Sequence, residues 1–300
     1  MTVLQGALLG IVQGVAEFLP ISSSGHLRLV QHFFALDDIP LLFDVVLHVA
    51  TLAAVILYFR KIIIRLFVVL FRWIFHKNEI ENSYDVSIVI EPDEKTLELA
   101  PSDKVGRKTI LYIILTTIVT GILGIASSKL IPDLSLKFVS AGFLVTACLL
   151  IISSFISRKH DILDSAEMHD NLFQVQDRGI TWKQALIIGI AQGFGTLPGV
   201  SRSGSTIAGA RLCGVSRKVA GDYSFLASIP AILGAFVLEL RHLDEMSGAI
   251  GFLPMIAGCV CAFVFGYIAL AIFMRIIRKG HLEWFAAYLI PLGIAGLIFL

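Results

Sequence analysis

Apolar stretches about as long as a bilayer is thick recur along the whole chain. They cover residues 42–60, 109–126, 136–156, 219–240, 250–274 and 282–299. A helix needs roughly 20 consecutive apolar residues to cross the hydrocarbon core of a bilayer. Because lipid cannot satisfy open backbone groups, such stretches are expected to be helical. We therefore predict an all-α polytopic membrane protein with six transmembrane helices, forming one integral membrane domain over residues 1–300.

The composition agrees with a membrane protein and argues against other classes. Hydrophobic residues make up 56% of the chain and charged residues only 16%, whereas soluble domains carry about 25% charged residues. The formal net charge is +1. A nucleic-acid partner is therefore not expected, because proteins that bind nucleic acids present a basic surface to the phosphates.

Two further apolar segments, residues 2–19 and 183–197, do not fit as simple spans. Each is interrupted by a proline and a cluster of Ser and Gly, after which a short apolar stretch follows. Such breaks survive at membrane depth only where protein or a wet cavity surrounds them. We expect both segments to begin re-entrant helix–break–helix hairpins, although a span kinked at proline is the simpler alternative.

The two hairpins are copies of each other. Residues 10–27 (GIVQGVAEFLPISSSGHL) align without gaps to residues 189–206 (GIAQGFGTLPGVSRSGST), at an offset of 179 residues. The two repeats, residues 1–157 and 180–300, then hold one hairpin and three spans each. Because that number of crossings is odd, the second repeat enters the membrane from the opposite side. This predicts an inverted-topology repeat whose hairpins face each other near the bilayer midplane.

The basic residues predict the orientation, because most of them fall on one side of the six spans. They are Arg60, Lys61, Arg65, Arg72, Lys77, Lys104, Arg107, Lys108, Arg158, Lys159, Arg178, Lys183, Arg217, Lys218, Arg275, Arg278 and Lys279. The positive-inside rule makes this side cytoplasmic. There we expect segment 61–75 to lie at the interface as a continuation of the first span, and polar residues 76–108 to form a cytoplasmic insert.

Each hairpin break is followed by a helix start that is rich in hydroxyl groups: Ser22, Ser23 and Ser24 in the first, and Ser201, Ser203, Ser205 and Thr206 in the second. Hydroxyls cap free backbone N–H groups, and two helix N-termini that meet inside a membrane form an anion site. Capping does not explain Arg202. A guanidinium at the deepest part of a hairpin is costly unless it is paired or bound to an anionic substrate.

Glu17 is a second costly charge within apolar sequence, one helical turn after Gln13. Arg202 is its obvious partner, and a purely structural ion pair between the two is the simpler alternative. The surrounding polar side chains exceed what one pair needs. Ser23 and His26, three residues apart, can act as nucleophile and as base or acid. Asp44 and His48 lie at positions i and i+4 near the outer end of the first span. They either lie at the membrane interface or contact the site residues from outside the site, and we favour the second arrangement.

Three motifs resemble the bacterial undecaprenyl-diphosphatases, the integral-membrane family associated with bacitracin resistance. They are Gln13-Gly-Val-Ala-Glu17, Phe18-Leu-Pro-Ile-Ser-Ser-Ser-Gly-His26-Leu and Pro198-Gly-Val-Ser-Arg202-Ser-Gly-Ser-Thr206. Segments 43–48 and 224–231 are also similar to family sequence, and the resemblance covers nearly the whole chain except 76–108. Gln13 departs from many relatives, which have glutamate there and thus one more metal ligand or base.

The resemblance implies removal of the terminal phosphate from undecaprenyl diphosphate, which recycles the lipid carrier for peptidoglycan synthesis and confers bacitracin resistance. It implies a bacterial inner (cytoplasmic) membrane protein whose site opens to the periplasm, with a polyprenyl diphosphate lipid as partner. The implied catalytic residues are Glu17, Ser23, His26 and Arg202, and Glu17 would hold a divalent cation, Mg²⁺ or Ca²⁺. The implied phosphate-binding residues are Gln13, Ser22, Ser24, Gly25, Gln192, Ser201, Ser203 and Thr206. Whether the chain forms a homodimer is left open.

Two mechanisms and one rival function stay open at this point. In one mechanism Ser23 attacks the terminal phosphorus with help from His26, while Glu17 holds the metal or acts as base. In the other, Glu17 or His26 activates a water molecule for direct attack. The rival is a transporter or flippase of an anionic lipid phosphate, because inverted repeats with broken helices are typical of transporters.

Overall fold

The computed structural model describes residues 1–36, 39–75, 103–130, 135–170, 180–240 and 250–300. Helices connected by short turns make up these ranges, and none of the residues in them forms a strand. The predicted all-α class is therefore confirmed. Most of the predicted insert, residues 76–102, lies outside the described part of the chain.

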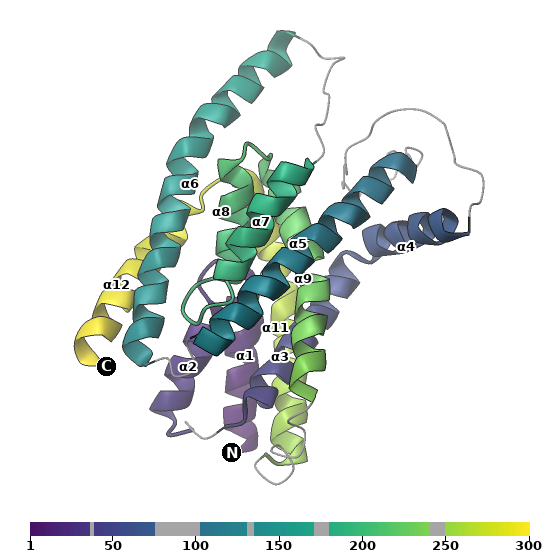
Figure 1. Ribbon diagram of the computed structural model, residues 1–300. Coiled ribbons are helices and arrows are strands. Elements are labelled where there is room, and N and C mark those ends of the chain that lie inside the picture. Colours follow the sequence, from purple (N-terminus) through teal and green to yellow (C-terminus); the bar gives the residue numbers. More distant parts are fainter. Residues whose placement is uncertain (37–38, 76–102, 131–134, 171–179, 241–249) are drawn as a thin grey trace.

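The helices form one elongated bundle (Figure 1). In chain order they are α1 Val3–Phe18, α2 Ser23–Phe33, α3 Leu41–Tyr58, α4 Arg60–Ile74, α5 Asp103–Leu130, α6 Leu136–Asp170, α7 Trp182–Phe194, α8 Arg202–Leu212, α9 Arg217–Glu239, α11 Phe252–Lys279 and α12 Glu283–Phe299.

The internal repeat is visible in where the helices begin. α1 and α7 start 179 residues apart, and so do α2 and α8. The same side chains define these starts. Thr2 and Thr181 each close a capping box with a glutamine three residues on, while the Oγ atoms of Ser22 and Ser201 each accept a hydrogen bond from the backbone N–H of a glycine three residues on. Such caps satisfy donors that a helix start leaves open.

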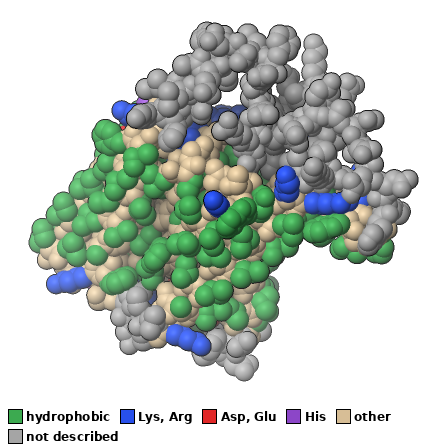
Figure 2. All heavy atoms as spheres, turned by 45° about the horizontal axis from the view of Figure 1, so that its top comes forward, with side chains coloured by type: hydrophobic (Ala, Val, Ile, Leu, Met, Phe, Trp, Pro, Cys, Tyr) green, Lys and Arg blue, Asp and Glu red, His purple; other side chains and the backbone are tan. Residues whose placement is uncertain are grey.

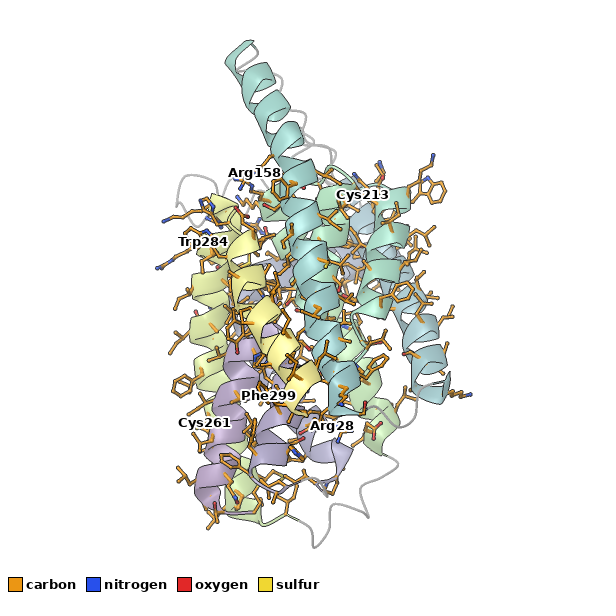
Figure 3. All side chains as sticks on the ribbon, turned by 90° about the vertical axis from the view of Figure 1, so that its left-hand side faces the viewer. Arg28, Arg158, Cys213, Cys261, Trp284 and Phe299 are labelled. Atoms are coloured by element: carbon orange, nitrogen blue, oxygen red, sulfur yellow. The ribbon has the colours of Figure 1, made fainter. Side chains whose placement is uncertain are left out.

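The two helix pairs run in opposite directions through the bundle. In Figure 1, α1 rises from the N-terminus at the bottom, whereas α7 descends from the top. Figure 3 shows the same relation for the second helix of each pair: Arg28, on α2, lies near the lower end of the bundle, and Cys213, directly after α8, lies near the upper end. The tips of the two pairs therefore meet in the interior.

Each pair is held by a helix from the other half of the chain. α1 packs against α11 so closely that a Cβ added at Gly10 would meet the backbone of Gly258. α7 packs against α5, where a Cβ at Gly193 would meet the side chain of Leu123. Small residues at four-residue spacing allow such close approach between helices. Because the halves interlock in this way, residues far apart in sequence share one interior.

The predicted spans coincide with apolar helices. Four are long and apolar enough to cross a membrane: Gly106–Lys129 in α5, Leu136–Arg158 in α6, Arg217–Glu239 in α9 and Phe252–Lys279 in α11. A fifth candidate is the bent pair of α3 and α4, whose axes differ by 81°. The helices α1 and α12 are apolar but shorter than these. The chain is thus a multi-pass membrane protein with four or five candidate spans among its described residues.

The outer surface agrees with this conclusion. In Figure 2 hydrophobic side chains cover broad continuous areas of the visible face, and the blue Lys and Arg side chains lie scattered among them. Exposed hydrophobic residues occur on most helices, for example Ile122 on α5, Phe155 on α6 and Ile298 on α12. An exposed apolar surface of this extent is typical of a protein that contacts lipid.

Candidate active site

A cavity of about 240 Å³ lies where the tips of the two helix pairs meet. Its walls come from both halves of the chain: α1 and α2 from the first pair, α7, α8 and the turn between them from the second, and α3, α5 and α9 around them. The lining residues are Glu17, Ser23, Ser24, Val45, His48, Thr120, Gln192, Gly195, Thr196, Val200, Ser201, Arg202, Ala231, Ile232 and Ala235.

The carboxylate of Glu17 is the most heavily hydrogen-bonded group in this cavity. Its Oε2 accepts hydrogen bonds from Ser23 Oγ at 2.6 Å and from Gln13 Nε2 at 3.0 Å, and His48 Nε2 lies 3.4 Å from the same oxygen. Its Oε1 accepts a hydrogen bond from Arg202 NH2. The next residue, Phe18, is buried and packs against Phe225 of α9 with the two rings tilted by 59°, which fixes the end of α1.

Arg202 provides the positive charge of the site. Its NH2 pairs with Glu17, but its NH1 is buried and has no hydrogen-bond partner among the residues that the structure describes. A buried, unpaired N–H donor is unfavourable. A guanidinium donates in a planar fork that suits phosphate oxygens, so an anion in the cavity would complete the hydrogen bonding of NH1.

Two helix N-termini point at the same place. α2 begins at Ser23 and α8 begins at Arg202, and both residues line the cavity. The N-terminal end of a helix carries a partial positive charge and open backbone donors, which favour an anion. The pairing of two such ends with Arg202 makes the polar half of the cavity suited to a phosphate or diphosphate group.

The remaining wall is apolar. Val45 on α3 faces Ala231, Ile232 and Ala235 on the second half of α9 across the cavity. The four side chains carry no hydrogen-bonding groups. A ligand that fits this site therefore combines an anionic head with an apolar continuation.

His26, which the sequence pairs with Ser23, is engaged elsewhere. Its Nδ1 lies 2.8 Å from the carbonyl oxygen of Ser22, and its Nε2 lies 2.8 Å from the hydroxyl of Tyr288 on α12. The ring stacks on Tyr288 and packs against Phe143 of α6. Because a carbonyl only accepts, Nδ1 carries the hydrogen and Tyr288 donates to Nε2. His26 thus does not line the cavity, and the histidine nearest to Ser23 and Glu17 there is His48.

The other predicted residues divide into two groups. Ser24, Gln192 and Ser201 line the cavity. The remainder hold the helix pairs around the cavity. In the first pair, Gln13 contacts Glu17, Ser22 caps α2, and Gly25 fits against the ring of Phe143. In the second pair, Ser203 contacts Ser201 and the carbonyl of Leu19, and Thr206 donates to the carbonyl of Arg202.

Ser22 shapes its turn through the backbone as well. It is one of the non-glycine residues with a positive φ, 71°, a conformation that few non-glycine residues adopt. Its carbonyl oxygen is thereby placed to accept from both the backbone N–H and Nδ1 of His26. Ser22 thus contributes both its side chain and its backbone conformation to the turn between α1 and α2.

Two of the hydroxyl-bearing residues that line the cavity were not predicted, Thr120 on α5 and Thr196 after α7. Thr120 accepts a hydrogen bond from Gln192 Nε2 at 3.0 Å and donates to the carbonyl of Thr116. Thr196 is the repeat counterpart of Glu17, and its Oγ donates to the carbonyl of Gly193. The repeat offset pointed to Thr196, whereas nothing local to α5 distinguishes Thr120 from the other threonines of that helix.

Comparison with known proteins places the chain in a family. A family described as bacitracin resistance protein BacA matches residues 6–295. A relative from Treponema denticola, named undecaprenyl-diphosphatase, is 42% identical over 294 residues, which cover 98% of this chain and 96% of the relative. Relatives of the same name from Methanosphaera stadtmanae and Desulfatibacillum aliphaticivorans are 35% and 36% identical, each over 98% of its own length. The chain therefore belongs to the bacitracin resistance protein BacA family.

Proposed function

We propose that this protein is an undecaprenyl-diphosphatase, which removes the terminal phosphate from undecaprenyl diphosphate. The observation that carries the proposal is the free NH1 of Arg202 in the same cavity as a serine hydroxyl bound to a carboxylate. The names of the relatives supply the substrate. The reaction returns the lipid monophosphate carrier to peptidoglycan synthesis. Loss or gain of this phosphatase activity would alter resistance to bacitracin.

The polar and the apolar parts of the cavity bind different parts of the substrate. The diphosphate binds Arg202 and the N-terminal ends of α2 and α8, where positive charge is concentrated. The first part of the polyprenyl chain lies against the apolar wall of α3 and α9, formed by Val45, Ile232 and Ala235 among others. This arrangement holds the terminal phosphorus near Ser23.

Ser23 is the nucleophile of the proposed reaction. Its hydroxyl already donates to Glu17 Oε2 at 2.6 Å, so the carboxylate can take the proton as Oγ bonds to the terminal phosphorus. The bond from phosphorus to the bridging oxygen breaks, and the lipid monophosphate leaves. Water then hydrolyses the phosphoserine, and inorganic phosphate is released. In the alternative mechanism Glu17 activates a water molecule that attacks the phosphorus directly.

A divalent cation, Mg²⁺ or Ca²⁺, fits the oxygen atoms beside Glu17. Gln13 Oε1 is buried and has no hydrogen-bond partner in the part of the chain that the structure describes, on the same amide whose Nε2 contacts Glu17. No group of three or more His, Cys, Asp or Glu side chains in the described ranges is arranged to hold a metal, but Mg²⁺ is often held by one or two carboxylates together with substrate phosphates. We therefore propose Glu17, Gln13 and the substrate as its ligands. When bound, the cation neutralises charge on the phosphate oxygens.

The proposed membrane arrangement has six spans and two re-entrant pairs, α1–α2 and α7–α8, in an inverted-topology repeat. The opposite directions of the two pairs support it. The end of the bundle that holds Arg158 and Cys213 faces the cytoplasm, because the C-terminal end of α11 adds Arg275, Arg278 and Lys279 there. The site then opens toward the periplasmic side of a bacterial inner membrane.

One assay tests the function. Detergent-purified protein is incubated with undecaprenyl diphosphate and a divalent cation, and inorganic phosphate is measured, with Arg202→Ala as the control. We expect release by the wild type and little by the variant. Absence of release with every polyprenyl diphosphate and cation tried would overturn the proposal, and movement of intact substrate across a vesicle membrane would favour a transporter.

A further inference from the structure

His48 stands in the cavity although it belongs to neither copy of the repeated helix pair. It lies on α3, lines the cavity, and places Nε2 3.4 Å from Glu17 Oε2. We infer that His48 is a positioning residue of the active site, whose ring lies against the Glu17 carboxylate and keeps it beside Ser23. The inference rests on the proposed phosphatase function.

The imidazole ring of His48 has a fixed orientation. Its Nδ1 lies 2.7 Å from the backbone carbonyl oxygen of Asp44, one turn earlier on α3. Because that carbonyl only accepts, Nδ1 is a donor, and the ring plane is set by its own helix. The second nitrogen then points at Glu17.

The helix that carries His48 is itself tied to the helix that carries Ser23. Gln31 Nε2, near the end of α2, donates to Asp44 Oδ1 at 2.7 Å. The α2–α3 contact is therefore held at two places, by the Gln31–Asp44 bond and by the meeting of Ser23 and His48 at Glu17. These contacts set the distance between the nucleophile, Ser23, and its base, Glu17.

Three side chains from three helices converge on one oxygen, Glu17 Oε2: Gln13 from α1, Ser23 from α2 and His48 from α3. Gln13 is on the same helix as Glu17 and cannot by itself fix where the carboxylate lies relative to α2. His48 approaches from another helix, so its ring restricts rotation of the carboxylate away from Ser23. Such support is required because a catalytic contact is sensitive to displacements of about 1 Å.

The second half of the chain has no counterpart of this arrangement. At the repeat offset of 179 residues, His48 corresponds to Ala227 and Asp44 to Tyr223, whose hydroxyl contacts Thr116 instead. Glu17 likewise corresponds to Thr196. The positioning histidine therefore occurs only in the half that carries the carboxylate, as expected if the two act together.

The test compares two substitutions that differ in one property. His48→Gln keeps an N–H donor, whereas His48→Leu fills a similar volume without one. We expect His48→Leu to lower kcat by about tenfold or more, the scale of a hydrogen bond to a charged group, with KM changed by less than about threefold because His48 contacts Glu17 rather than the phosphate. We expect His48→Gln to restore kcat to within about threefold of the wild type. His281→Leu, a substitution in the turn just before α12 and outside the cavity, serves as the control.

Thermal midpoints of all variants are measured in the same detergent. If His48→Leu lowers the midpoint, His48→Met replaces it as the variant without a donor. The inference is wrong if the variant without a donor keeps the wild-type kcat, if Gln loses as much as Leu, or if only KM changes. These outcomes are distinct from failure of the proposed function, in which the wild type itself releases no phosphate and both conclusions fall.

Discussion

Arg202 NH2 and Glu17 Oε1 form an ion pair across 185 residues of sequence. Glu17 lies in the last turn of α1, in the first half of the chain, and Arg202 begins α8, in the second half. Both side chains are largely shielded from solvent. Because Oε2 of the same carboxylate binds Ser23, this pair connects Arg202, the proposed phosphate-binding residue, to Ser23, the proposed nucleophile. Under the proposed function the ion pair therefore does more than link the two halves.

Replacement of the Ser23 hydroxyl tests the covalent route. We expect Ser23→Ala to lower turnover by about a hundredfold or more, in line with the loss of a catalytic group, and to leave the thermal midpoint nearly unchanged because Ser23 is partly exposed. Ser127→Ala on α5 is the control, since its hydroxyl donates to the carbonyl of Gly124 and does not line the cavity. Acid-quenched wild-type protein should carry one phosphoryl group at Ser23 by mass spectrometry. Near-normal turnover of Ser23→Ala would instead favour direct attack by water.

A double-mutant cycle tests the Glu17–Arg202 pair. Removing one partner of a buried ion pair leaves an uncompensated charge and costs about 3–5 kcal/mol. We expect Glu17→Gln and Arg202→Met each to lower the thermal midpoint, and the double variant to be more stable than the sum of the single losses predicts. Phosphate release should be lost in all three, because the double variant restores no catalytic group. Simple additivity of the midpoints would show that the two charges are not coupled.

The sequence predicted the helix pairs and the meeting of their tips because both depend on local chemistry. The capping side chains Thr2 and Thr181, and Ser22 and Ser201, recur at one offset. The pairing of Glu17 with Arg202 followed from the cost of each charge in apolar surroundings.

The orientation of His26 could not be predicted in the same way. Spacing alone places His26 and Ser23 near one another on α2, but the ring is directed by Tyr288, which lies 262 residues away on α12. Its packing against Phe143 also depends on how α6 crosses α2. His48 and Thr120 reach the cavity for the same kind of reason, since their places depend on the packing of α3 and α5.

Close packing of α1 against α11 should control the position of Glu17. A side chain at Gly10 would meet the backbone of Gly258, and overpacking of this kind typically costs about 1–3 kcal/mol. We expect Gly10→Val to lower the thermal midpoint and to reduce phosphate release, because α1 carries Glu17. Gly121→Ala on α5 is the matched control, where an added Cβ meets no atom within 4 Å. Equal behaviour of the two variants would contradict this role of Gly10.

The amide at position 13 should set the requirement for a divalent cation. Gln13→Glu adds a second carboxylate beside Glu17, and hard cations bind more tightly as the number of charged oxygen ligands rises. We expect the Mg²⁺ concentration for half-maximal phosphate release to fall. Gln192→Glu provides the comparison, because its amide contacts Thr120 rather than Glu17, and it should not lower the requirement. A fall in both variants would indicate a general effect of negative charge in the cavity.

The opposite directions of α2 and α8 predict that their far ends lie on opposite sides of the membrane. Arg28 is exposed on α2, and Cys213 follows α8 at the other end of the bundle (Figure 3). In a background without the other native cysteines, a membrane-impermeant thiol reagent added to spheroplasts should label Arg28→Cys. It should label Cys213 only after permeabilisation, because the basic ends of α9 and α11 lie near Cys213 and mark the cytoplasmic side.

Two other labelling patterns are informative. Labelling of Cys213 alone from outside would reverse the orientation while preserving the inverted repeat. Labelling of both positions from the same side would contradict the inverted repeat, since two helix pairs that enter from one side cannot place these residues at opposite ends. The expected pattern would also support a cavity that opens toward the periplasm. Val45 and His48 belong to the first half of α3 and Ala235 to the second half of α9, and both of these half-helices lie toward the lower end of the bundle in Figure 1.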